Sequence, residues 1–492
     1  MSRLWWSLLL CVSVVAATPC GRKDLRCLLT DPARQWAANT TVSFPGSDEF
    51  QLATERWTVF SPPTYSAAIS PGTTEDVVKA VQLMTSHRIP FLVRGAGHAY
   101  TITPGTFKGG LAIDLSHQTS VEIDSAAETI TVGPGVTIAE IFDPLYDAGF
   151  ELQTGTASCP SLIGLSLGGG VGRQQGQHGL VLDAMVSLRV ITASGDQVEV
   201  SKNSHPDLFW AFRGAGANFG VVTSATYSVR PLTNKGNVLN VEFFFTPDQV
   251  PAYFEVVESL NGKIPANMAA MNIIQFNPEY NITQLISGWT YFGPEDEGLK
   301  FLEPILALST PVSQSQVPWN RLVATAGGGV DQLICQPNTI RDLYNVNLKN
   351  YSAATFQQVF TKMADFYENH PGGRNSIVGI ELFPNQAMAA VPLDETAFPW
   401  RDATGYIYAT FIWGPGDSNT ESAARSLGPE LRNDLAATSG YDSLTVFVNY
   451  ARGDEPLESV YGADKLPRLV DLKRTWDPDN VFRYNNGLIR GY

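Results

Sequence analysis

The stretch Val93-Arg94-Gly95-Ala96-Gly97-His98-Ala99-Tyr100 decides the fold that we expect for this chain of 492 residues. It continues an apolar run at residues 89–94 that is typical of a strand, and its glycines flank an alanine just before a histidine. Glycine has no Cβ, so the backbone of such a loop can approach a ligand closely and present its N–H groups to anionic oxygens. We interpret the stretch as a cofactor-binding loop at the end of a strand.

A second glycine-rich stretch follows later, Leu167-Gly168-Gly169-Gly170-Val171-Gly172. It overlaps Gly164-Leu165-Ser166-Leu167-Gly168, which fits the G-x-S-x-G pattern of serine hydrolases. That pattern must lead into a helix, where each glycine costs about 1 kcal/mol, so a hydrolase using Ser166 is only a minor alternative. A tight turn would be the commoner explanation of one such loop. Two of them, one with a histidine, favour a bound dinucleotide, although neither a Rossmann fingerprint nor a P-loop is present.

The composition excludes several classes of protein. The chain carries 33 Lys and Arg against 48 Asp and Glu, with a net charge of −15 and a pI near 4.9. This balance argues against nucleic acid and against anionic lipid as partners, because both require clustered basic residues. Hydrophobic residues make up 44% of the chain, and 43 Gly and 31 Pro indicate a loop-rich globular protein. The length allows two or three domains.

The first 17 residues are typical of a secretory signal peptide. Arg3 precedes an apolar run at residues 4–15, and Val15-Ala16-Ala17 offers small residues for cleavage. The alternative, a membrane anchor, is less favoured because the run is shorter than the roughly 20 residues of a spanning helix. Later segments contain no run of 18 apolar residues, so we expect no membrane anchor in the mature chain and a location outside the cell or in the secretory lumen.

Cysteines and sequons agree with export. Cys20 and Cys27 lie close together, and we predict that they form a disulfide. A zinc site is the rival interpretation, but no histidine lies nearby, and we predict no metal site. Asn39, Asn281 and Asn350 each begin an N-x-S/T sequon and could carry N-glycans.

The pattern of apolar residues divides the chain. Strands are predicted at residues 65–69, 89–94, 111–115, 121–123, 129–132, 188–192, 197–200 and 221–229. Helices are predicted from a cap at Thr74, from a Thr137–Glu140 capping box to about residue 148, and at residues 207–212, 353–367 and 419–435. From about Asn234 to Leu444, longer alternating runs such as Tyr406 to Trp413 indicate a second α+β region with an antiparallel sheet.

The first glycine loop resembles the R-G-x-G-H segment of berberine bridge enzyme-like flavoproteins. These belong to the vanillyl-alcohol oxidase superfamily, which has an FAD domain of the p-cresol methylhydroxylase type. Further matches follow in the family's order: residues 167–172, Gly179-Leu180 with Asp183, residues 207–214 and 218–223, Asn449-Tyr450, Tyr461-Gly462 and residues 476–482. The resemblance is strong over residues 57–230 and the last 50 residues, and weak in the middle.

The resemblance implies an α+β fold in two parts. Residues 57–232 would form the FAD-binding domain, residues 233–444 a substrate domain with an antiparallel sheet covered by helices, and residues 445–492 a segment that returns to the FAD domain. It also implies an FAD-dependent oxidoreductase, with dioxygen as the expected electron acceptor and a small specialised metabolite as substrate. A carbohydrate oxidase is the alternative within the family, and a non-catalytic flavin-binding protein is a minor one.

Within this family His98 matches the histidine that bonds covalently to the flavin. A neutral imidazole is a competent nucleophile, and the neighbouring glycines would allow it to approach the ring. The cofactor-binding residues expected from the matched motifs are Arg94, Gly95, Ala96, Gly97, His98, Ala99, Gly155, Cys159, Gly168, Gly169, Gly170, Gly172, Gly220 and Val222.

Many relatives carry a second flavin link through a cysteine. Here the family's position falls on Ala157, and Cys159 lies two residues later. A second link through Cys159 is therefore the less favoured interpretation. The alternatives are a small buried thiol and a disulfide with Cys335.

The catalytic residues expected are tyrosines. Tyr450 and Tyr100 match pocket tyrosines of the family, and Tyr408 lies on the strand where relatives place an acid or amide. Residues 406–410 contain no Asp or Glu, so no acidic base is assigned. Ionised Tyr450 is the first candidate for the base and Tyr408 the second. A tyrosine base needs a neighbour that stabilises the phenolate, because its ordinary pKa is near 10.

Overall fold

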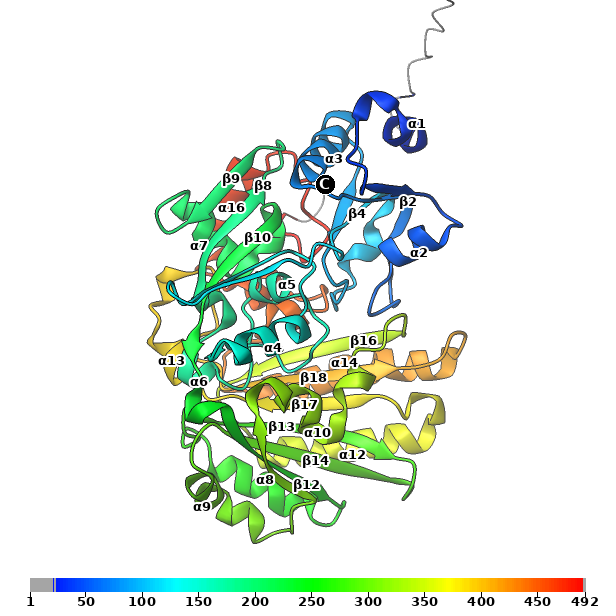
Figure 1. The fold of residues 1–492 in the computed structure, drawn as a ribbon. Helices are drawn as coiled ribbons and strands as arrows, with labels where there is room; N and C mark the ends of the chain where they lie inside the picture. The colour runs from blue at the N-terminus through cyan, green and yellow to red at the C-terminus, as the bar shows by residue number, and fades with distance from the viewer. Residues whose placement is uncertain (1–20, 22–23, 490–492) are drawn as a thin grey trace, which may run out of the picture.

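A computed structural model describes residue 21 and residues 24–489. Figure 1 shows two parts, one above the other, with the N-terminal half and the C-terminal segment in the upper part and one large sheet with its helices in the lower part. No helix among the described residues is long and apolar enough to cross a membrane. The predicted signal peptide and Cys20 lie outside the described residues, so the signal and the Cys20–Cys27 disulfide stay predictions.

The upper part begins with a four-stranded sheet in the order β1-β2-β4-β3, of which the last three strands are parallel. Helix α3 packs on it through Val77, Val81 and Met84, the face that the sequence predicts. The helix cap is Thr73, one residue before the predicted Thr74, and its side chain accepts a hydrogen bond from the Asp76 N–H. The elements are α1 (Leu25–Thr30), β1 (Thr41–Ser43), α2 (Asp48–Ala53), β2 (Thr64–Ser70), α3 (Thr74–His87), β3 (Phe91–Arg94) and β4 (Lys108–Asp114).

A five-stranded antiparallel sheet completes the upper part, in the order β5-β6-β10-β8-β9. Two predicted local motifs are confirmed: the hairpin around Gly195 joins β8 to β9, and the capping box of Thr137 and Glu140 opens α4. The elements are β5 (Val121–Asp124), β6 (Thr129–Val132), α4 (Ile138–Asp147), α5 (Leu162–Ser166), α6 (Gln175–His178), β8 (Met185–Ile191), β9 (Gln197–Ser201), α7 (Pro206–Ala215) and β10 (Val221–Ser228). Strands β7 (Phe150–Glu151) and β11 (Arg230–Pro231) pair separately.

The lower part is a seven-stranded antiparallel sheet in the order β15-β12-β14-β13-β17-β18-β16. Helices α8, α9, α12 and α14 pack on one face, as expected for a sheet covered by helices. The elements are β12 (Asn237–Phe245), α8 (Val250–Ser259), β13 (Met268–Asn277), β14 (Ile282–Tyr291), α9 (Glu295–Leu306), β15 (Ser313–Pro318), α10 (Leu322–Gly329), α11 (Asp331–Ile334), β16 (Arg341–Leu348), α12 (Ala353–Asn369), β17 (Ile377–Leu382), α13 (Gln386–Ala390), β18 (Gly405–Ile412) and α14 (Ser418–Ala437).

Alternation along the strands decides which side chains face the upper part. Val378, Ile380 and Leu382 of β17 join the core beneath the helices, because successive side chains in a strand point to opposite faces. Gly379 and Glu381 therefore lie on the other face. Gly379 is directly opposite Tyr408 of β18, and a Cβ there would lie 2.1 Å from the Tyr408 ring, so only glycine leaves room for that ring.

The C-terminal segment returns to the upper part through α15 (Leu457–Tyr461) and α16 (Leu466–Trp476), and α16 packs beside α7 (Figure 1). The fully buried Lys473 ammonium holds it there. It donates to Asp477 at 2.6 Å and to the carbonyls of Asn218 and Phe482, both at 2.7 Å.

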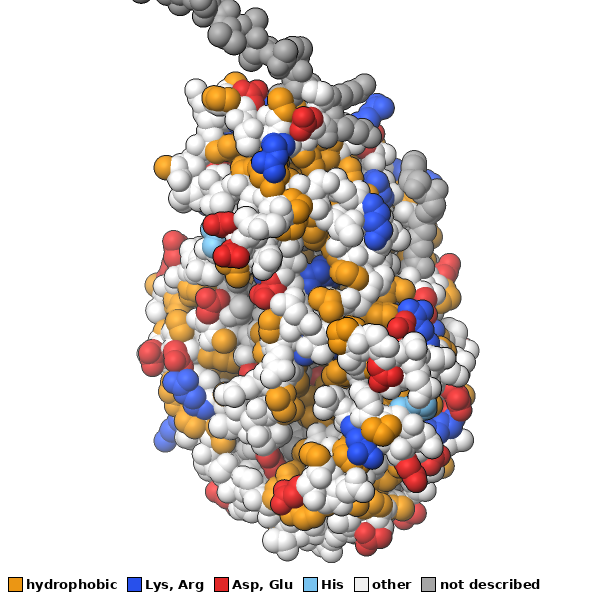
Figure 2. All heavy atoms as spheres, turned by 90° about the vertical axis from the view of Figure 1, so that its right-hand side faces the viewer, with side chains coloured by type: hydrophobic (Ala, Val, Ile, Leu, Met, Phe, Trp, Pro, Cys, Tyr) orange, Lys and Arg blue, Asp and Glu red, His pale blue; other side chains and the backbone are white. Residues whose placement is uncertain are grey.

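On the face shown in Figure 2, acidic and basic side chains are interspersed among neutral ones.

Replacing Lys473 with alanine is expected to lower the free energy of unfolding by about 3–5 kcal/mol, because the buried Asp477 carboxylate loses its cation. The neighbouring Arg474→Ala is the matched control. Arg474 is 70% exposed and pairs with the exposed Asp471, so its loss is expected to stay below about 1 kcal/mol. Denaturant unfolding measures both, and similar losses for the two variants would contradict this role of Lys473.

Candidate active site

A cavity of about 680 Å³ lies between the two parts, and residues from nearly the whole length of the chain line it. The predicted positions that line it are Arg94, Gly95, Ala96, Gly97, His98, Ala99, Tyr100, Gly155, Gly168, Gly220, Val222, Tyr408 and Tyr450. The structure therefore brings the first glycine loop, the expected tyrosines and the start of the second glycine stretch to one place.

Three glycines of the second stretch do not line the cavity, contrary to expectation. A Cβ on Gly169 would lie 2.8 Å from the Phe447 ring, one on Gly170 2.4 Å from Val181, and one on Gly172 1.9 Å from the Thr154 carbonyl oxygen. The absence of a side chain at these positions thus serves close packing within the protein. Gly97 combines both features, since it lines the cavity with a φ of +73° while its missing Cβ would lie 2.8 Å from the Glu55 carbonyl oxygen.

The predicted Arg94 is part of the framework around the loop. It donates to Asp114 at 2.7 Å and to the carbonyl of Glu55 at 2.9 Å. These contacts join β3 to β4 and to the segment after α2, and they fix the start of the glycine loop.

His98 presents an unpaired nitrogen. Its ring stacks on Trp57 with centroids 4.6 Å apart and meets the edge of Tyr100 at 5.4 Å. Its Nε2 is buried and has no hydrogen-bond partner among the described residues. Burial, with a contribution from the charge of Arg341, lowers the pKa of His98 to about 3, so the imidazole is neutral at physiological pH.

The three predicted tyrosines form one cluster. Tyr450 meets the rings of Tyr100 and Tyr408 at centroid distances of 5.4 and 5.3 Å. Burial raises the pKa of all three phenols, and the negative charge of Glu381 raises it further. For Tyr450, burial and the neighbouring Glu381, Tyr100 and Tyr408 all raise the pKa, so these surroundings favour a protonated phenol over the ionised Tyr450 expected above.

Glu381 is the acidic group that the sequence analysis missed. It lies on β17, one strand away from the residues searched, and its Oε1 accepts a hydrogen bond from Thr156 Oγ1 at 2.9 Å. The Tyr450 hydroxyl donates to the same carboxylate at 3.3 and 3.4 Å. Burial raises the pKa of Glu381 to about 7, although Thr156, Tyr450 and the charge of Arg173 oppose that rise. The sequence did contain a signal for this residue, because Glu381 is the single charged residue in the apolar run IVGIEL at residues 377–382.

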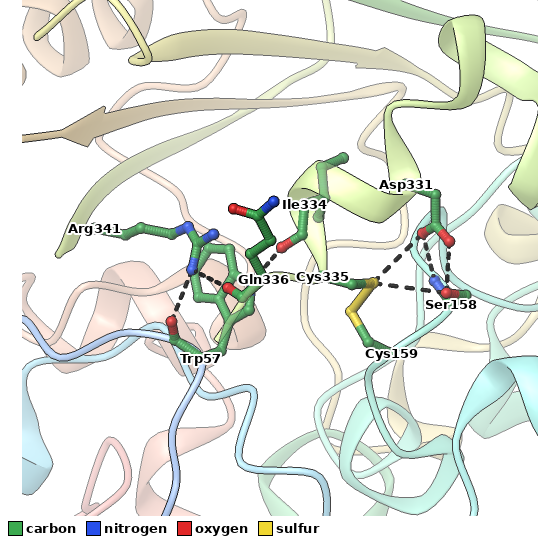
Figure 3. Close-up of a disulfide and its surroundings, with 8 residues drawn as sticks. All are labelled: Trp57, Ser158, Cys159, Asp331, Ile334, Cys335, Gln336 and Arg341. Atoms are coloured by element: carbon green, nitrogen blue, oxygen red, sulfur yellow. Dashed lines mark hydrogen bonds between the residues drawn. A yellow bond between two sulfur atoms is a disulfide. The ribbon is translucent and has the colours of Figure 1, made fainter. Parts of the chain in front are cut away.

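Two further alternatives are settled by direct contacts. Ser166 is fully buried, and its hydroxyl is bonded to the Ile163 carbonyl at 2.9 Å and the Tyr227 hydroxyl at 2.7 Å, so it is not the exposed nucleophile of a hydrolase. Cys159 forms a disulfide with Cys335, with Cα atoms 5.7 Å apart (Figure 3). This is one of the alternatives left open above, and it corrects the assignment of Cys159 as a cofactor-binding residue, since its sulfur is already bonded.

Known proteins share this organisation. The family described as "FAD binding domain" matches residues 65–201, and the family described as "Berberine and berberine like" matches residues 446–489. The chain is 45% identical over 473 residues to the FAD-linked oxidoreductase fogF of Aspergillus ruber, covering 95% of each chain. It is 46% identical over 456 residues to the FAD-linked oxidoreductase OXR1 of Pyricularia oryzae, covering 92% of this chain and 90% of the relative.

Solved structures show the same fold at low sequence identity. BBE-like 1 of Physcomitrella patens has a TM-score of 0.81 at 22% identity, and the xylooligosaccharide oxidase of Myceliophthora thermophila C1 has 0.78 at 23%. Each match covers 95% of this chain and 99% of the other. The α+β fold expected above, an FAD-binding domain with an antiparallel-sheet domain, is confirmed. Two family models match separate stretches of this chain, and relatives at 45% and 46% identity cover nearly its full length. The chain therefore belongs to the berberine bridge enzyme-like family of FAD-linked oxidoreductases.

Proposed function

We propose that this FAD-linked oxidoreductase is an oxidase that binds FAD covalently through His98 and takes a proton from its substrate with Glu381. The contact of the Glu381 carboxylate with Tyr450 and Thr156, both of which line the cavity, is the observation that carries the proposal. Glu381, with a pKa of about 7, therefore lies directly behind two residues that line the cavity, and the neutral His98 lines the same cavity.

The residues around the cavity fit FAD. When bound, this cofactor supplies an acceptor for a hydride. His98 offers a buried nitrogen without a partner and a neutral ring, which is the state a nucleophile needs. Gly95 and Gly97 leave backbone exposed along the same wall, and the cavity volume lies in the range of cofactor sites. The covalent bond to His98 is part of the proposal, and Cys159 has no part in it.

Glu381 and Tyr450 divide the proton transfer between them. The Tyr450 hydroxyl lines the cavity and can accept a proton from the substrate while it gives its own to the Glu381 carboxylate. Its ring then never needs to exist as a free phenolate, which burial and the neighbouring charge disfavour. Thr156 holds the second contact of the carboxylate and keeps it oriented. Tyr100 and Tyr408 pack against Tyr450 and fix its ring.

We propose a small organic substrate from specialised metabolism and dioxygen as the final electron acceptor. Relatives named FAD-linked oxidoreductases at 45% and 46% identity support the reaction class. The carbohydrate and oligosaccharide oxidases among the structural matches share the fold at 20–23% identity, so carbohydrate oxidation is the alternative rather than the first choice.

We also propose export of the protein through the secretory pathway. The predicted signal peptide at residues 1–17 and the Cys20–Cys27 pair support it, and the side chains of Asn39, Asn281 and Asn350 are all exposed. Each asparagine is therefore accessible as a glycan acceptor.

Acid precipitation of the wild-type protein is expected to leave the flavin on the polypeptide, and His98→Ala is expected to release it, because no other nucleophile is assigned to the link. Absorbance of the washed precipitate measures this. Cys159→Ser serves as the control and should retain the flavin. Flavin that stays bound to the His98→Ala protein would refute attachment through His98.

Glu381→Gln is expected to slow flavin reduction by about 10²–10⁴-fold while the flavin stays attached, because the amide keeps the shape of the side chain but accepts no proton. In the wild type the rate should increase with pH through about 7, since the carboxylate acts only when ionised, and this increase should vanish in the variant. Anaerobic stopped-flow measurement checks both. A rate within about tenfold of the wild type, with the pH dependence intact, would assign the base to another group.

A further inference from the structure

One wall of the cavity is a short segment that we call the strap, residues 327–338, which runs from the end of α10 through α11 towards β16. Val330, Leu333, Ile334 and Gln336 of the strap line the cavity. The strap begins with Gly327, Gly328 and Gly329, whose φ angles are +68°, +68° and +79°. It buries little apolar surface of its own, and Leu333 is 64% exposed. Its position must therefore depend on specific anchors.

The strongest anchors connect the strap to the loop of residues 155–161, in which residues 155–157, 160 and 161 line the cavity. Cys335 is joined to Cys159 by the disulfide, across 176 residues of sequence. Beside it, the Asp331 carboxylate accepts hydrogen bonds from the Ser158 N–H at 2.9 Å and from the Ser158 hydroxyl at 2.6 Å (Figure 3). A covalent bond and a carboxylate thus fix neighbouring residues of the strap to neighbouring residues of the loop.

The loop end of this connection is held independently. The carbonyls of Ser158 and Pro160 accept hydrogen bonds from Ala139 and Ile138 at the start of α4, at 2.9 and 3.0 Å. The loop therefore stays with the FAD-binding domain whether or not the disulfide is present. The disulfide constrains the strap.

The other end of the strap reaches Trp57. The Trp57 indole N–H donates to the Ile334 carbonyl, and Arg341 donates from the same nitrogen to the carbonyls of Gln336 at 2.8 Å and Trp57 at 2.7 Å (Figure 3). The Arg341 guanidinium lies 4.0 Å from the centroid of the Trp57 ring. Because Trp57 also stacks on His98, the strap adjoins the proposed site of flavin attachment.

The chamber beside the strap is lined by apolar side chains together with polar ones such as Gln275, Asn375 and Thr410. The apolar lining from the sheet consists of Phe276 of β13, Ile377 of β17 and Ile412 of β18. Val330 and Ile377 pack against one apolar cluster on the face of the sheet. Arg374 lies flat on Phe276 at 4.2 Å, with its Nε bonded to the Tyr367 carbonyl. Among the described residues that line the cavity, none is Asp, Glu or Lys.

We propose that the strap is the specificity-determining wall of the substrate chamber, that the Cys159–Cys335 disulfide holds it in place, and that the chamber accepts an alkyl or aryl arm of the substrate. The proposal rests on the proposed function, because it takes this cavity as the place where the substrate binds. Burial of such an arm removes apolar area from water, and each buried methylene contributes about 0.8 kcal/mol, or about fourfold in affinity.

Calorimetric titration of the flavin-loaded protein with 4-ethyl-, 4-butyl- and 4-hexylbenzamide tests the chamber, since these neutral probes differ only in the length of the alkyl arm. Affinity is expected to increase about three- to fourfold per methylene in the wild type. Leu333→Ser should weaken binding of the hexyl probe about five- to tenfold and leave the ethyl probe unchanged. Leu393→Ser is the matched control, because Leu393 is 61% exposed and does not line the cavity. An affinity independent of chain length, or equal effects of the two substitutions, would overturn the proposal.

The double variant Cys159→Ser/Cys335→Ser tests the disulfide without leaving a free thiol. Its gain per methylene is expected to fall below about twofold, and the backbone amides of residues 327–338 should exchange with deuterium at least tenfold faster than in the wild type. An unchanged gain together with unchanged exchange would refute the role of the disulfide. These binding data are independent of catalysis. If the Glu381→Gln variant keeps full activity while the probes bind as expected, the proposed base is refuted and the assignment of the strap is retained.

Discussion

The buried carboxylate of Glu381 is the constraint around which the rest of the site is arranged. A carboxylate out of contact with water is costly unless hydrogen bonds compensate it, and here the donors come from two other segments, Thr156 and Tyr450. The sheet, the loop after β7 and the C-terminal segment must therefore all be in place for the carboxylate to be tolerated. The same requirement positions Tyr450 at the cavity wall and keeps its phenol protonated.

Local sequence patterns predicted the elements that short-range contacts determine. The capping box at Thr137, the hairpin around Gly195 and the strand leading into His98 each depend on a few neighbouring residues, and the structure has them all. The glycine run at 168–172 shows the limit of this reasoning. A missing Cβ can make room for a ligand or for a neighbouring side chain, and only the packing of Phe447 and Val181 distinguishes the two.

Local sequence patterns could not assign the position of Glu381 or the pairing of Cys159 with Cys335. Both depend on long-range properties, namely the register between strands and the packing of distant segments. Glu381 reaches the site because β17 pairs with β18 in a register that sets Gly379 against Tyr408. A shift by one residue would turn the carboxylate into the core beneath the helices. Cys159 and Cys335 are likewise brought together by the packing of the sheet domain on the FAD-binding domain. The residues next to each cysteine in the sequence do not indicate this packing.

The return of the C-terminal segment has a consequence for biosynthesis. The cavity wall includes Tyr450 and residues 481–486, which are synthesised long after His98 and its glycine loop. Until these residues have been synthesised, the glycine loop has only part of its surroundings, and the buried Lys473 that fastens the segment lacks the Phe482 carbonyl. A complete cofactor site thus cannot exist on a nascent chain. Capture of a cofactor in the complete cavity must therefore follow synthesis of the C-terminal segment, so its supply is needed where that late folding step takes place.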